Sequence, residues 1–530
     1  VGDKSQFTYY GSSNCQRCHF GPIQQDFDEG RTYFLRMDES SVWQLHDRHS
    51  KAFKLLECER GQAMGRSLGW NVTNDQRCLG CHANWQADRP NPGVSILSEG
   101  VACEACHGPS SKYINDHSLP KWRAIPLATR SADYGMLMLR DPLVRGQVCL
   151  SCHIGSAAEG KVITHEMYAA GHPPLPSFEL RNFDESMKHW SDLPDQLAKL
   201  DKDHPPHADE TRRNLEFIRS QLGEDAATQP ALKTALTGAI LTLRQSTQLL
   251  ADEAVGKVNH PQVENKTLPL PLGEGSGEGT TPEINNSVTK TASPPSAWPE
   301  FALYDCAMCH HDLRYPAWRQ VRSDGSPGRP QIPRWPQALV DVAIAQAAGS
   351  DQAAAARLRQ EFAARLNDLN QPFLRQPFAN PTEIAKPAAA MTNFLDNLLG
   401  QLAKTKFNTA ASLTALKQLS LNATTTTPDY DSARQFAWAF QSIWDELNKS
   451  GATPSLSATT QARINSELDV IKAELQLRLN SLKPDVKDVC SQAISPGELQ
   501  SALDCAAGYS PQQFQQHMRA IGESLSAGRN

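Results

Sequence analysis

The sequence of 530 residues lacks the long apolar run that a membrane-spanning helix requires. Its best candidate, residues 231–250, is interrupted by Lys233 and Arg244, so we expect no transmembrane segment. The sequence also lacks a basic excess, with 52 Lys and Arg against 58 Asp and Glu. Residues 1–165 are balanced too, with 18 basic and 17 acidic side chains, so we expect no nucleic-acid partner.

Strand patterns are scarce as well, whereas apolar residues recur at helical spacing in several segments. Leu358, Phe362 and Leu366 define one helix face, and the preceding Asp351 can cap that helix. Further apolar faces of this kind occur within residues 207–255, 436–447 and 464–482. The sequence therefore predicts a mainly α fold with a helical bundle near its C-terminus.

Cysteine, in contrast, follows a regular pattern. Ten of the 13 cysteines form five Cys-x-x-Cys pairs, and a histidine directly follows each pair. The pairs are Cys15 and Cys18, Cys78 and Cys81, Cys103 and Cys106, Cys149 and Cys152, and Cys306 and Cys309, and the histidines are His19, His82, His107, His153 and His310. Histidine is only 16 of 530 residues, so chance would give this arrangement with a probability on the order of 10⁻⁸.

Cys-x-x-Cys-His is the attachment signature of c-type haem. The two thiols bond covalently to the porphyrin edge, and the histidine binds the iron as its proximal ligand. Structural zinc sites and thioredoxin-type pairs also use Cys-x-x-Cys, but zinc needs further ligands and neither requires this histidine. We therefore predict five covalently bound haem c groups, in a multihaem cytochrome c core with much coil that precedes the helical bundle.

The sequence has eleven other histidines that could bind the irons on their second axial side. A haem iron with two histidine ligands has no open position, so this abundance favours electron transfer over catalysis. The best candidates for distal ligands are His49, His117, His165, His172, His311 and His189. His311 follows His310 directly and cannot bind the same iron, but it could reach a neighbouring haem. Met64 is an alternative ligand.

Haem is attached by export-side machinery, so we expect a periplasmic or extracellular protein. No signal peptide is visible at Val1, as expected if the sequence is that of a mature form. Cys490 and Cys505 suit an oxidising compartment, and we expect them to form a disulfide that contributes about 3 kcal/mol. Cys58 then remains as a small buried apolar residue.

The spacing of the motifs and a change in composition predict five parts of the chain. Residues 259–300 hold 7 Pro, 4 Gly and 9 Ser or Thr, which is typical of a flexible linker or long surface loop. The predicted parts are a tetrahaem core (1–200), a helical hairpin (201–258), this linker (259–300), a fifth haem segment (301–335) and a C-terminal helical domain (336–530).

Several segments resemble one known family. They are the motif region 100–109, residues 47–52 around His49, the loop 170–173, and residues 309–313. These segments are similar to periplasmic multihaem cytochromes related to the tetrahaem carrier that accepts electrons from hydroxylamine oxidoreductase. The resemblance covers about residues 10–190 and 300–320, and it implies an electron relay with His49, His117, His165 and His172 as distal ligands. The fifth motif and about 200 C-terminal residues have no counterpart in the four-haem pattern.

We therefore expect an exported pentahaem cytochrome that passes electrons between redox partner proteins and is not itself an enzyme. One alternative is an oxidoreductase that acts on a small nitrogen or sulfur compound at one open haem, with Arg130, Tyr134 and Arg140 as donors to the substrate. Another is a structural subunit of a complex or filament that assembles through residues 336–530.

Overall fold

The structure is a computed structural model that describes residues 7–22, 37–84, 94–187, 202, 208–224, 228–257, 298–310, 329–450, 456–477, 489–492 and 496–527. These residues form helices joined by irregular segments, and their single β-bridge, between Ser156 and Lys161, is isolated. The prediction of a mainly α fold is confirmed. Within the described ranges, no helix combines the length and apolar character needed to cross a membrane.

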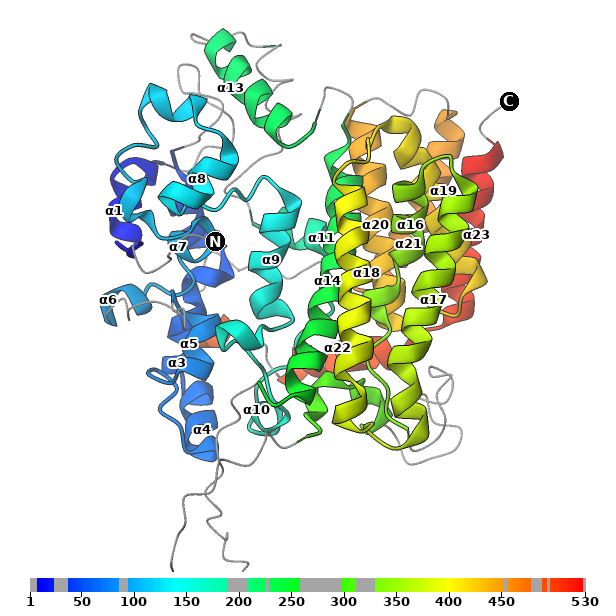
Figure 1. The fold of residues 1–530 in the computed structure, drawn as a ribbon, viewed down its shortest axis with the longest axis horizontal. Coiled ribbons are helices and arrows are strands. Elements are labelled where there is room, and N and C mark those ends of the chain that lie inside the picture. Colours follow the sequence, from blue (N-terminus) through cyan, green and yellow to red (C-terminus); the bar gives the residue numbers. More distant parts are fainter. Residues whose placement is uncertain are drawn as a thin grey trace, which may run out of the picture.

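The molecule has two halves (Figure 1). The first half contains short helices: α1 (Ser12–His19), α2 (Glu39–His46), α3 (Ala52–Glu57), α4 (Glu59–Leu68), α5 (Gln76–His82), α6 (Val94–Leu97), α7 (Cys103–His107), α8 (Leu127–Tyr134), α9 (Pro142–His153), α10 (His165–Ala169) and α11 (Leu180–Ser186). The 3₁₀ turns η2 (Arg48–Lys51), η3 (Ser110–Lys112), η4 (Pro120–Ala124) and η5 (Ala157–Glu159) connect them. We call this part the motif half, because it carries the first four Cys-x-x-Cys-His motifs.

The second half consists mainly of long helices that pack side by side. They are α14 (Pro230–Ala254), α16 (Val340–Ala348), α17 (Gln352–Arg375), α18 (Ala385–Leu402), α19 (Thr409–Thr425), α20 (Tyr430–Lys449), α21 (Ala458–Glu474), α22 (Pro496–Gly508) and α23 (Pro511–Ala527). Helix α14 lies between the halves and packs on both α9 and α18 (Figure 1). Helix α13 (Ala208–Gln221) precedes it, and the division into five domains stays a prediction.

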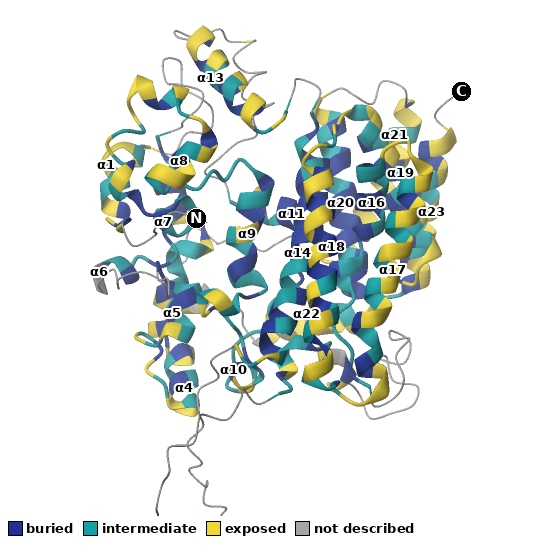
Figure 2. Cartoon of the chain, viewed as in Figure 1, coloured by how far each residue is buried: buried dark blue, intermediate teal, exposed yellow. Residues whose placement is uncertain are grey.

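The helical half has a continuous apolar core. Figure 2 shows the buried faces of α14, α18 and α20 at its centre. Trp438 and Trp444 of α20 are fully buried, and their indole N–H groups donate to Leu477 O at 2.9 Å and to Asn465 Oδ1 at 2.7 Å. Because these polar groups are satisfied, the indole rings add apolar contact area without a desolvation penalty. The interior of the helical half is therefore filled by side chains, most of them its own.

The motif half is built differently. Its own apolar cluster is small and consists of Phe53, Leu56, Val72, Leu79, Ala83 and Leu97. Short helices cannot bury much apolar surface by themselves. The side chains of this half therefore form only a small core, which leaves room for bound groups between its helices.

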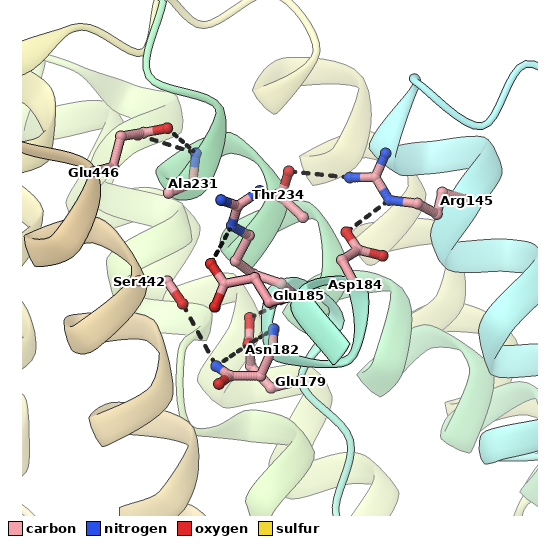
Figure 3. Close-up of polar contacts among 10 residues, drawn as sticks. Arg145, Glu179, Asn182, Asp184, Glu185, Ala231, Thr234, Ser442 and Glu446 are labelled. Carbon is pink, nitrogen blue, oxygen red and sulfur yellow. Dashed lines mark hydrogen bonds and ion pairs between the residues drawn. The ribbon is translucent and has the colours of Figure 1, made fainter. Parts of the chain in front are cut away.

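Buried polar residues tie the two halves together (Figure 3). Arg145 Nε on α9 lies 2.8 Å from Asp184 Oδ2 on α11, and the same guanidinium donates to Thr234 Oγ1 on α14 at 3.3 Å. Asn182 of α11 donates to Ser442 Oγ on α20 at 3.5 Å. Removing one partner of a buried polar contact leaves the other partner unsatisfied, so these contacts hold α9 at a fixed position against the bundle.

Two glycines allow the halves to approach closely. A Cβ atom on Gly238 of α14 would lie 2.5 Å from Leu180 Cβ, and one on Gly146 of α9 would lie 2.6 Å from Leu241 Cδ1. Both distances are shorter than van der Waals contact, so a side chain at Gly238 would collide with the Cβ atom of Leu180, whereas one at Gly146 would have to displace the end of the Leu241 side chain. Helices α9, α11 and α14 therefore pack closely at these two glycines.

The predicted Cys490–Cys505 disulfide is wrong. Cys490 is bonded to Cys58, which also corrects the prediction that Cys58 is an isolated apolar residue. Cys490 lies in the short turn η10 (Val489–Gln492), which packs on α3, whereas Cys505 lies on α22 and packs against the bundle core. The two C-terminal cysteines therefore face different parts of the molecule.

Candidate functional site

The first four motifs each form the end of a helix. His19, His82, His107 and His153 are the last residues of α1, α5, α7 and α9. Residues three apart share one helix face, so both cysteines of a motif can reach the same porphyrin edge, and the histidine directly follows them. The fifth motif begins with the 3₁₀ turn η7 (Cys306–Met308) and ends at His310.

Four of the five motif histidines face a second histidine. The ring centres are 6.3 Å apart for His19 and His117, 6.2 Å for His153 and His49, 6.3 Å for His82 and His172, and 6.2 Å for His310 and His165. The second histidines are the four that the family resemblance implied as distal ligands. Sequence reasoning did not predict which of them faces which motif.

This spacing has a direct chemical meaning. A metal–imidazole bond is about 2.0–2.1 Å long, and the ring centre lies about 1.1 Å behind the nitrogen. Two imidazoles on opposite sides of one metal ion would therefore have centres about 6.3 Å apart, with either parallel or perpendicular rings. The four pairs match this distance, although their interplanar angles range from 16° to 90°.

Hydrogen bonds orient five of these eight imidazoles. Nδ1 of His82, His117 and His172 lies 2.8, 3.0 and 2.7 Å from the carbonyl oxygens of Ala52, Tyr113 and Pro173. Nδ1 of His19 and of His49 lies 2.9 and 2.8 Å from a carboxylate, Glu39 and Asp47. A proton on Nδ1 leaves Nε2 with a free lone pair, as a metal-binding histidine requires.

Burial also favours neutral imidazoles at several of these positions. Burial lowers the pKa of His153 to about 3 and that of His172 to about 4, and it lowers the pKa of His82 and of His117. A neutral imidazole binds a metal without first losing a proton. Burial also favours neutral His49, but the Asp47 carboxylate outweighs it and raises the pKa of His49.

The fifth motif is held against its histidine partner by one buried carboxylate. Glu300 Oε1 accepts a hydrogen bond from the backbone N–H of His165 at 2.8 Å and from that of Ala302 at 2.8 Å. Trp298 and Tyr304 anchor the same segment to the helical half by donating to the carbonyl oxygens of Ala379 and Phe378. The segment around the fifth motif is therefore positioned by both halves.

A cavity of about 2190 Å³ connects several of the sites. Its walls include motif residues of the second, third, fourth and fifth motifs, together with His49 and His172. Pockets for single small ligands are usually about 300–1000 Å³, so this volume suits several large groups. The paired imidazoles, the motif cysteines and this volume together fit covalently bound haem groups, and those groups would complete the interior of the motif half.

The remaining site residues predicted from the sequence do not belong to the four histidine pairs. His311 and His189 lie outside the described residues, and the distal ligand for His107 stays a prediction. Arg130 donates to the carbonyl oxygens of Ile125 and Trp122 at 2.9 Å each, and the Tyr134 ring packs edge-on against Trp122. Both side chains thus stabilise the loop around η4, and neither is part of the cavity wall.

Sequence reasoning missed the carboxylates that hold two imidazoles. Asp47 lies two residues before His49, so the short Asp-x-His pattern could have indicated it. Glu39 is 20 residues from His19, and no local pattern connects them. The same holds for Glu300, which is 135 residues from His165.

Comparison with known proteins gives a family match for part of the chain. Residues 14–108, which include the first three motifs, match the family described as "Cytochrome c554 and c-prime". No curated protein and no solved structure matches the chain. The family match supports a c-type cytochrome that carries covalently bound haem c and transfers electrons.

Proposed function

We propose that this protein is an exported pentahaem cytochrome that passes electrons along a chain of mostly bis-histidine haems. We number the haems 1 to 5 after their motifs in chain order. The observation that carries the proposal is the set of four imidazole pairs spaced 6.2–6.3 Å apart, the distance expected when both imidazoles bind one iron. Bound haem supplies an iron that alternates between its ferric and ferrous states, so each site carries one electron.

Contacts between motifs support an order of the haems in space. The backbone N–H of Gly11, which directly precedes α1, donates to Glu104 Oε2 within motif 3 at 2.7 Å, which brings sites 1 and 3 together. Cys152 Sγ of motif 4 lies 3.9 Å from the carbonyl oxygen of Gly80 within motif 2, which brings sites 2 and 4 together.

Backbone contacts join these two groups. The N–H of Val101, two residues before Cys103, donates to the carbonyl oxygen of His49 at 3.0 Å, and His49 is the histidine that faces His153. Sites 3 and 4 are therefore neighbours. His165 and His172 are seven residues apart and face His310 and His82, so sites 5 and 2 are also neighbours. The resulting order is 1, 3, 4, 2, 5.

The two ends of this chain are the most open to solvent. Cys18 of motif 1 and both cysteines of motif 5 are exposed, whereas those of motifs 2, 3 and 4 are half-buried. Electrons can pass only between groups that come close, so we expect redox partner proteins to dock near haems 1 and 5. The protein therefore conducts electrons through its interior from one docking site to the other. Its proposed location is periplasmic or extracellular.

The protein chain holds the irons in a fixed environment. At four sites its paired imidazoles would hold an iron from both sides, and its hydrogen bonds keep Nδ1 of five of these imidazoles protonated. A substrate would then have no place to bind at these irons. This arrangement favours electron transfer over the oxidoreductase alternative.

The proposal can be tested on the matured protein. Intact mass and a pyridine haemochrome assay should give five haems per chain, and electron paramagnetic resonance should show at least four of them to be low-spin. A redox titration should then show several one-electron steps. Fewer than five haems, or high-spin iron at two or more sites, would contradict the proposal.

A further inference from the structure

The acceptors that hold the imidazoles differ from site to site. At site 2 both Nδ1 atoms face neutral carbonyl oxygens, those of Ala52 and Pro173. At site 4 His49 faces the Asp47 carboxylate, and at site 1 His19 faces the Glu39 carboxylate. These three sites are therefore not equivalent, even though each has a pair of histidines.

Both carboxylates are well positioned. Asp47 is 7% exposed, and its Oδ1 accepts hydrogen bonds from the backbone N–H of His49 at 2.9 Å and from Nδ1 at 2.8 Å. Glu39 Oε2 lies 2.9 Å from Nδ1 of His19, and its side chain is 18% exposed. Charges that are shielded from water interact more strongly with their neighbours than exposed charges do.

A carboxylate has two effects on a metal-bound imidazole. It attracts the Nδ1 proton, which makes Nε2 a stronger electron donor to the metal. Its negative charge also stabilises the ferric form, which carries one more positive charge than the ferrous form. Both effects lower the reduction potential, and a neutral carbonyl oxygen produces much smaller effects.

We propose that Glu39 and Asp47 are positioning residues that lower the reduction potentials of haems 1 and 4 below that of haem 2. This inference rests on the proposed function, because it assumes that His19 and His49 bind iron. In the order 1, 3, 4, 2, 5, the low-potential haems lie toward one end and haem 2 lies toward the other. Electron transfer from haem 4 to its neighbour haem 2 is therefore downhill.

The test compares Asp47→Asn and Glu39→Gln with the wild-type protein. Each variant keeps an oxygen acceptor but removes the charge, so in each we expect the potential of one haem to rise. At an ambient potential at which that haem is half reduced in the wild type, its ferrous-to-ferric ratio should rise about tenfold, which is about 59 mV for one electron. Spectroelectrochemical titration measures the ratio, and the paramagnetic resonance signal of that haem should shift with it.

Two further variants separate tuning from a merely structural role. Asp47→Glu keeps the charge and should retain a potential close to that of the wild type. Asp75→Asn is the matched control: Asp75 caps α5, the helix that carries motif 2, and forms an ion pair with Arg77, but it bonds to no imidazole. We expect Asp75→Asn to change every potential by less than the tenfold criterion.

The outcomes distinguish this inference from the proposed function. Five low-spin haems with unchanged potentials in Asp47→Asn and Glu39→Gln would overturn the inference and leave the conduit in place. Loss of low-spin iron in both variants would also overturn it, because the carboxylates would then be structural. Failure of the wild-type protein to show five haems would instead overturn the proposed function.

Discussion

Cys58 and Cys490 form a disulfide although 432 positions separate them in the sequence. Cys58 lies between α3 and α4 in the motif half, and Cys490 belongs to η10, just before α22. Both cysteines line the cavity that the motif residues share. The bond therefore attaches the C-terminal part of the chain to the half of the molecule that carries the first four motifs.

Breaking this disulfide should destabilise the protein. The bond closes a very long loop, so Cys58→Ser/Cys490→Ser should lower the free energy of unfolding by about 2–5 kcal/mol. Urea denaturation followed by circular dichroism measures the change. Cys505→Ser is the control and should cost less than about 1 kcal/mol, because Cys505 has no disulfide partner. A non-reducing peptide map that links Cys490 to Cys505 would contradict the structure.

The contact between the halves should tolerate no added methyl group at Gly238. A Cβ there would lie 2.5 Å from Leu180 Cβ, so Gly238→Ala should destabilise the protein by about 1–3 kcal/mol. Gly400 is the matched control, because it lies within α18, is exposed and has open space around it. Gly400→Ala should stabilise the protein by about 0.5–1 kcal/mol. Equal effects of the two substitutions in urea denaturation would show that the halves do not approach as closely as described.

The pairing of His165 with His310 predicts the effect of removing one imidazole. His165→Ala should convert one haem from low-spin to high-spin, because an iron bound by His310 would lose its proposed ligand on the opposite side. Electron paramagnetic resonance and the optical spectrum measure this change. His517→Ala is the control, because His517 pairs with Glu467 at 2.7 Å within the helical half. An unchanged spin state in His165→Ala would rule out His165 as a ligand.

Features that depend on neighbouring residues can be predicted from the sequence. The Cys-x-x-Cys-His pattern predicts five attachment sites within five residues each, and apolar periodicity at Phe436, Phe440 and Ile443 predicts a helix that is indeed buried. The pairing of histidines was not predictable, because His19 and His117 are almost 100 residues apart. No periodicity specifies which distant segment folds over a given motif.

The disulfide is a second example of a long-range contact that local sequence patterns do not predict. Proximity in sequence favoured Cys490 with Cys505, since short loops close easily. The helix α22 prevents this pairing, because it places Cys505 against the bundle core while η10 extends toward α3. Long-range packing therefore decided the disulfide, and packing of that kind leaves no signal in the spacing of cysteines.

The buried carboxyl of Asp184 should make stability depend on pH. Burial raises the pKa of Asp184 to about 7, although Arg145 and Arg181 oppose this shift and Glu179 adds to it. The folded protein therefore holds a proton on Asp184 between about pH 4 and 7 that the unfolded chain releases, so stability falls as the pH rises through this window. Asp184→Asn cannot lose that proton and lacks this contribution.

Comparison of the two proteins at pH 5 and pH 8 isolates the effect. Between these values the free energy of unfolding of the wild type should fall relative to that of Asp184→Asn, by on the order of a few kcal/mol. Glu185→Gln is the control, because Glu185 is half-exposed and lies 3.1 Å from Arg181 Nε, so its charge is partly screened. If wild type and Asp184→Asn lose stability in parallel from pH 5 to pH 8, Asp184 is already ionised at pH 5, and Arg145 and Arg181 compensate its charge.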